Sequence, residues 1–156
     1  MNSAMIRTLT SLIFLLTTFL SVAANAEKKE VFPGPDGSDY EVHYIAFAST
    51  FLDEEVARQY QLVRSRSLGL VNISIIKVDK EGKRKAVGGS VQAEMINEIR
   101  QSQFLSFQQV IEGDAIYYLA QLQYREGDLL TFDVTVYPQG GTQPLKLRFT
   151  QNFYND

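Results

Sequence analysis

The feature that most constrains this fold is the strict alternation of apolar and polar residues near the C-terminus, in LLTFDVTVYPQGGTQPLKLRFTQNF. A period of two is typical of β-strands with one buried face. With the loop centred on Gly140 and Gly141, two apolar pairs form on one face and one opposite-charge pair on the other: Phe132 with Phe149, Val134 with Leu147, and Asp133 with Arg148. A one-residue shift would exchange the two faces, so the sequence predicts one register for this hairpin.

The alternation extends back to Phe104 and predicts two further strands. Their inward residues are Leu105, Phe107 and Ile111 in the first strand and Ile116, Tyr118, Ala120 and Leu122 in the second. Opposing Ile111 to Ile116 leaves Gly113-Asp114 as a two-residue turn, and opposing Leu122 to Leu130 leaves a three-residue loop that ends at Gly127. We therefore expect an antiparallel meander from Phe104 onward, with positive φ at both glycines.

Glu-Gly-Asp occurs twice, at residues 112–114 and 126–128, and the two copies could be halves of one acidic site. They lie at opposite ends of the predicted strand 115–124, about 30 Å apart at about 3.3 Å per residue. Catalytic carboxylates work within about 10 Å of each other. Each copy alone supplies two carboxylates, whereas Ca²⁺ needs about six to eight oxygens. We predict two turns and no metal site.

Before Phe104 the pattern predicts three strands and one short helix. Residues 40–48 alternate between the two faces of a predicted strand. Residues 67–78 are apolar on both faces, which is typical of a central strand. Residues 86–96 contain Gly88-Gly89, which is typical of a bulged edge strand. Gly82 lies in the predicted turn between the last two of these strands. Asp53 can cap a helix of about two turns at residues 53–60, and two glutamates follow it in the first turn.

About seven strands and one short helix predict a two-sheet antiparallel β-sandwich, of which the immunoglobulin fold is an example. A small closed β-barrel is the alternative. Residues 27–38 combine charges, prolines and glycines, so we expect an extended lead-in to a single domain at residues 39–156.

Residues 1–26 have the layout of a cleavable secretory signal, with one charge at Arg7, an apolar stretch, and Ala24-Asn25-Ala26 before the cleavage point. An uncleaved anchor is the alternative, but the apolar run is short and interrupted by Thr and Ser. Cleavage would leave 130 residues, no transmembrane segment, and 14 Lys and Arg against 18 Asp and Glu. An acidic exported chain is a poor binder of nucleic acid. Without cysteine there are no disulfides, thiol nucleophiles or thiolate metal sites, and no cofactor is expected.

Three groups of residues are candidates for binding or chemistry. His43, the single histidine, lies on one strand face with Glu41, so a His–carboxylate pair is conceivable, against a histidine that only satisfies a hydrogen bond at a sheet edge. A basic run that includes Lys83, Arg84 and Lys85 could contact anionic lipids or an acidic partner, against a solvated turn. The third group is the set of outward-facing tyrosines that could form a binding face: Tyr117, Tyr137 and Tyr154.

Several blocks in order, among them DYEVHYIAFASTFL, EGDAIYYLAQ, LLTFDVTVYPQGG and LKLRFTQNFYND, resemble domain-of-unknown-function family 4426 (DUF4426), whose members are exported proteins of Gram-negative bacteria. The resemblance spans nearly all of the chain after residue 26 and implies one periplasmic β-rich domain. It implies no role for any residue.

We expect a non-enzymatic module that binds an envelope protein or peptide through a sandwich face, an edge strand or a loop end. The alternative is a small periplasmic hydrolase or ligand-binding protein that uses His43 with Glu41 or with the carboxylates of residues 53–55.

Overall fold

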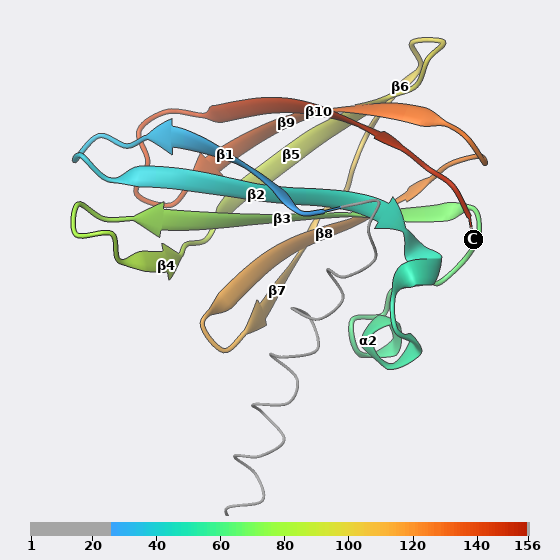
Figure 1. The fold of residues 1–156 in the computed structure, drawn as a ribbon, viewed down its shortest axis with the longest axis horizontal. Coiled ribbons are helices and arrows are strands. Elements are labelled where there is room, and N and C mark those ends of the chain that lie inside the picture. The colour runs from blue at the N-terminus through green and yellow to red at the C-terminus, as the bar shows by residue number, and fades with distance from the viewer. Residues whose placement is uncertain (1–25, 156) are drawn as a thin grey trace, which may run out of the picture.

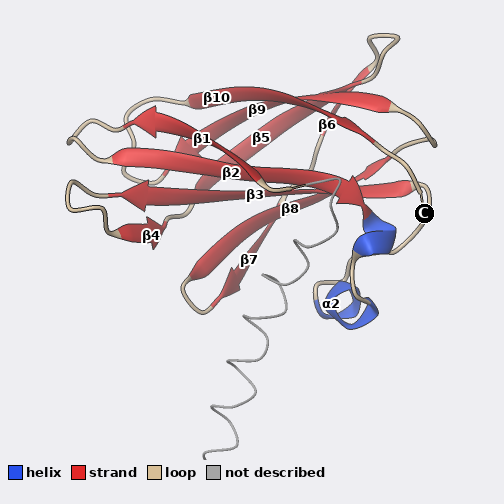
Figure 2. Cartoon of the chain, in the orientation of Figure 1, coloured by secondary structure: helices blue, strands red, loops and turns tan. Residues whose placement is uncertain are grey.

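The structure, a computed structural model, describes residues 26–155, so the predicted signal segment before Ala26 lies outside the described part of the chain. Two antiparallel sheets pack face to face without closing into a barrel (Figures 1 and 2). The predicted two-sheet sandwich is therefore confirmed, and the barrel alternative is wrong. No helix within residues 26–155 has the length and apolar character needed to cross a membrane.

Sheet A has the strand order β1-β2-β3-β8-β7, and β4 pairs with the C-terminal end of β3. Sheet B has the order β10-β9-β5-β6. The strands of sheet A are β1 (Lys28–Pro33), β2 (Asp39–Ala48), β3 (Leu68–Val78), β4 (Arg84–Ala86), β7 (Gln108–Glu112) and β8 (Ala115–Gln123). Those of sheet B are β5 (Gly89–Ile96), β6 (Ser102–Phe104), β9 (Leu129–Pro138) and β10 (Leu145–Asn152). A 3-10 turn (Ser49–Phe51) and helix α2 (Glu54–Gln59) join β2 to β3.

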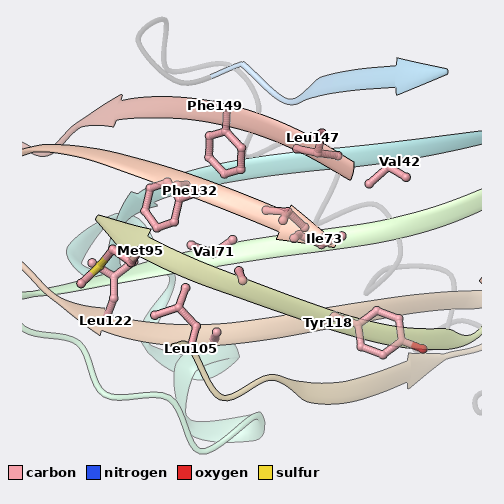
Figure 3. Close-up of a cluster of buried hydrophobic side chains, with 14 of the residues drawn as sticks. Val42, Val71, Ile73, Met95, Leu105, Tyr118, Leu122, Phe132, Leu147 and Phe149 are labelled. Carbon is pink, nitrogen blue, oxygen red and sulfur yellow. The ribbon is translucent and has the colours of Figure 1, made fainter. Parts of the chain in front are cut away.

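The core lies between the two sheets and follows the predicted alternation. Inward residues of both sheets are almost completely buried, and Figure 3 shows the centre of this cluster: Val42, Val71 and Ile73 from sheet A, with Phe132, Leu147 and Phe149 from sheet B. Tyr44 of β2 stacks on Phe149 of β10 with ring centroids 4.6 Å apart. The buried hydroxyl of Tyr118 on β8 donates to the carbonyl of Gly89 on β5 (2.9 Å) and so joins the sheets.

Two predicted hairpins form with the predicted register. In β9–β10, Phe132 pairs with Phe149, Val134 with Leu147, and Asp133 with Arg148. In β7–β8, Ile111 pairs with Ile116, and Gly113 between them has φ 56°. Gly82 and Gly140 also have positive φ in their turns. In the turn at Gly140, the backbone N–H of Gly141 donates to the Pro138 carbonyl.

The rest of the predicted meander is wrong because the chain changes sheet twice. The single strand predicted from Phe104 to Ile111 is two strands, with β6 in sheet B and β7 in sheet A, so Leu105 is buried at the crossing whereas Ile111 is exposed. The predicted hairpin between β8 and β9 is absent, because Leu122 pairs with Gly69 and Leu130 with Gln151. Gly127 keeps the predicted positive φ (83°), but its turn carries the chain from sheet A to sheet B.

Two predictions for the first half of the chain are also corrected. The lead-in at residues 27–38 contains β1, an edge strand paired with β2, because its backbone can pair although few of its side chains are buried. The predicted edge strand at 86–96 is divided at Gly88-Gly89, after which β5 lies between β9 and β6. A Cβ at Gly89 would stand 2.4 Å from the Tyr137 carbonyl oxygen. The start of β5, where the chain passes from sheet A to sheet B, therefore requires glycine.

Helix α2 forms as predicted, with the Asp53 carboxylate accepting from the backbone N–H of Glu55 (2.8 Å). The segment after it crosses the outer face of sheet A, where the Gln121 side chain hydrogen-bonds the backbone of Val63. Leu70 and Leu119 also face outward on this sheet, yet they are only 2% and 8% exposed. Sheet A is therefore buried on both faces over part of its area.

Candidate functional site

His43 lies on the outer face of sheet A between two carboxylates. Its Nε2 is 2.8 Å from Oε2 of Glu41, and its Nδ1 is 2.7 Å from Oε1 of Glu27. Glu41 follows from the period of β2, which places residues 41 and 43 on the same face. Glu27 precedes β1 and would be the first residue of the chain after the predicted cleavage. The predicted pair of His43 and Glu41 is present, and a second carboxylate that the sequence did not indicate completes it.

Glu41 is the centre of this group. Arg84 of β4 binds it through both terminal nitrogens, at 2.9 Å and 2.5 Å, and Lys29 of β1 lies 3.2 Å away. The Glu41 side chain is only 8% exposed. Hydrogen bonds from Arg84 above all, followed by those from His43 and Lys29, lower the pKa of Glu41 to about 2 against the opposing effect of burial. The same carboxylate raises the pKa of Arg84. We call Glu27, Lys29, Glu41, His43 and Arg84 the His43 cluster.

The His43 cluster has the geometry of a clamp between strands rather than of a catalytic triad. A triad needs one imidazole nitrogen on a nucleophile and the other on an orienting carboxylate. Here both ring nitrogens face carboxylates. Within residues 26–155, no group of three or more His, Asp or Glu side chains is arranged to hold a metal ion. What the cluster does is tie β1 and β4 to β2.

The basic run predicted as one binding element is divided by the structure. Arg84 turns onto Glu41, whereas Lys83 and Lys85 are exposed and form no ion pair within the described residues 26–155. Lys83 uses its backbone N–H to close the β3–β4 turn on the Asp79 carboxylate (2.7 Å). Of Lys83, Arg84 and Lys85, only the two lysines therefore keep a charge without an ion pair within residues 26–155.

The three outward-facing tyrosines lie on different surfaces. Tyr117 is on the outer face of sheet A, where burial, with smaller contributions from the charges of Glu112 and Glu27, raises its pKa. Tyr137 is exposed on β9 of sheet B, and Tyr154 is exposed after β10. They do not form one tyrosine face.

A surface that the sequence reasoning missed lies along the β6–β7 side of the sandwich. Ile99, Phe104 and Ile111 are the three most exposed large apolar residues of the described chain, at 75%, 74% and 64%. Only three residues join β6, an edge strand of sheet B, to β7, an edge strand of sheet A. The sequence signal was available, because residues 101–111 (QSQFLSFQQVI) contain no charge. We call residues 101–111 the neutral edge.

Comparisons with known proteins agree with this architecture. The family model described as domain of unknown function DUF4426 matches residues 36–156. The crystal structure of a DUF4426 family protein from Pseudomonas aeruginosa PAO1 is similar, with 29% sequence identity and a TM-score of 0.63 over 82% of this chain and 96% of that chain. The search of curated proteins finds no match. The chain belongs to the DUF4426 family.

Proposed function

We propose that this protein is a non-enzymatic interaction module of the periplasm, exported by its N-terminal signal and binding an envelope protein or peptide. The observation that carries the proposal is the neutral edge, where exposed Phe104 and Ile111 accompany two open edge strands. Aromatic side chains such as Phe104 are enriched at protein interfaces. Open edge strands can take up an extended segment of a partner by main-chain pairing.

The other sheet edges are protected in the ways that natural proteins use against unwanted pairing. β1 carries Lys28 and Lys29 and ends at Pro33. β10 carries Lys146 and Arg148. The contrast between these charged edges and the neutral edge supports binding at β6 and β7.

The proposal can be tested by placing a photo-crosslinking amino acid at position 104 in cells. Irradiation should join the protein to a discrete envelope partner through this position. The matched control is the same amino acid at the exposed Thr150 of β10, which should give no such product. Equal products from both positions, or none from position 104, would contradict binding at the neutral edge.

A small hydrolase or ligand-binding protein that uses His43 is the alternative, and the contact of 2.8 Å between His43 and Glu41 is the observation in its favour. Against it, the second ring nitrogen is engaged by Glu27 and Glu41 is engaged by Arg84. A His43→Gln substitution separates the two functions. The interaction module should complement a deletion strain with this substitution, and a hydrolase should not.

A further inference from the structure

We infer that the neutral edge pairs with the same edge of a second copy of this chain, in a symmetric and weak dimer. The inference rests on the proposed function, because it names one partner of the same surface. Three observations carry it, namely the free main chain of β6, the absence of charge, and the exposed side chains on the same segment.

The main chain of β6 has one side free. The Leu105 backbone N–H donates to the Ala93 carbonyl (2.9 Å), and the Gln101 carbonyl accepts from Asn97 (3.0 Å), so the odd-numbered residues here face β5. Hydrogen-bonding directions alternate along an antiparallel strand. Ser102 and Phe104 therefore point their N–H and C=O groups away from β5, at the open border of sheet B.

In a symmetric dimer, the charge on an edge strand decides whether two copies of that strand repel each other. In a two-fold contact each residue meets itself or a residue of the same edge, so like charges on that edge are brought together. Self-pairing of β10 would bring Lys146 and Arg148 near their own copies. The neutral edge has no charge to repel its copy.

The side chains of β6 also suit a second copy. Gln103 is exposed, and a glutamine amide both donates and accepts, so it can hydrogen-bond to its own counterpart across a two-fold axis. Antiparallel pairing centred on Gln103 would set Phe104 beside Ser102 of the second copy on the outer face. This would cover part of an aromatic ring that is 74% exposed in the single chain.

The contact is small, because β6 has three residues and β7 has five. Small interfaces are typical of weak and transient association. We therefore expect a monomer–dimer equilibrium rather than a permanent dimer, detectable between about 10 µM and about 1 mM protein.

Sedimentation equilibrium on the purified protein tests the inference. The wild type should show a reversible dimer, and Phe104→Lys or Gln103→Lys should weaken it by at least about tenfold, since symmetry introduces each charge twice. Thr150→Lys, which adds the same charge to the other edge of sheet B, should leave it unchanged. All three variants should keep the thermal midpoint of the wild type, which shows that any loss is not unfolding.

Three results would overturn the inference: a wild type that is monomeric at about 1 mM, a dimer that survives both β6 substitutions, and a dimer that Thr150→Lys also disrupts. Failure here is distinguishable from failure of the proposed function. A monomer that is still crosslinked to an envelope partner from position 104 refutes only the dimer. A dimer that is crosslinked from this position only to its own copy refutes only the envelope partner.

Discussion

The outer faces of the two sheets each carry an arginine that binds a carboxylate through two nitrogens, and the two pairs differ in their surroundings. On sheet A, Arg84 binds Glu41, whose side chain is 8% exposed and also contacts His43 and Lys29. On sheet B, Arg148 binds Asp133, with side chains 66% and 34% exposed.

This contrast indicates a structural role for the His43 cluster. Sheet A is partly covered by the segment around α2 and fixed by the His43 cluster, whereas the outer face of sheet B is open to solvent. An isolated exposed ion pair contributes little to stability, but a buried carboxylate must keep its donors. We propose binding at the neutral edge because its side chains are exposed and the outward backbone groups of β6 are unpaired within residues 26–155.

The largest expected effect is on the covered part of sheet A. Leu70→Ala removes an outward-facing side chain that is only 2% exposed, and we expect a loss of about 3 kcal/mol of unfolding free energy. Urea unfolding measures it. Thr150→Ala, on the open face of sheet B, should cost less than about 0.5 kcal/mol. Similar losses for both would show that the two faces are equally open.

Glu41→Gln should lower the unfolding free energy by about 2 kcal/mol, because Arg84, His43 and Lys29 lose the charge that they share. Thermal and urea unfolding should give the same loss of unfolding free energy. Proper folding of the variant is checked by its unchanged far-ultraviolet circular dichroism. A loss no larger than that of Asp133→Asn would contradict a structural role for the His43 cluster.

The unfolding free energy in acid should also depend on the Glu41 carboxylate. The pKa of Glu41 is about 2 in the folded protein against an ordinary 4.5, so its contribution is complete above about pH 4.5 and disappears as the pH falls toward 2. The unfolding free energy of the wild type should therefore fall in this window by up to about 1.4 kcal/mol per pH unit more than that of Glu41→Gln. Parallel pH profiles for the two proteins would refute the low pKa.

The smallest effect is expected on sheet B. Asp133→Asn removes an exposed pair and should cost about 0.5 kcal/mol in dilute buffer. In about 1 M salt the difference from wild type should vanish, because exposed charges are screened. A cost that persists in salt would mean that this pair acts more like Glu41 than we infer.

Local patterns predicted much of the fold. The β9–β10 register followed from alternation and a central Gly-Gly, and α2 followed from the Asp53 cap. The choice of sheet could not be predicted in the same way. Alternation shows that Leu122 and Leu130 are inward, but inward residues of both sheets point to the same core, so it does not show that β8 and β9 are in different sheets.

The candidate site was predictable only in part. Period two placed His43 and Glu41 on one face, but the contacts of Glu27 and Arg84 depend on the pairing of β1 and β4, which no local pattern specified. Phe104 and Ile111 were expected in one strand of a meander, whereas they lie in edge strands of different sheets.

Hydrogen exchange at increasing protein concentration reports which backbone groups become protected on association, and so locates the binding surface. We expect amides of residues 101–111, Phe104 above all, to gain protection as concentration rises or an envelope partner is added, whereas β10 and the His43 cluster do not change. Protection that appears on β10 or around His43 while residues 101–111 stay unchanged would contradict binding through the neutral edge.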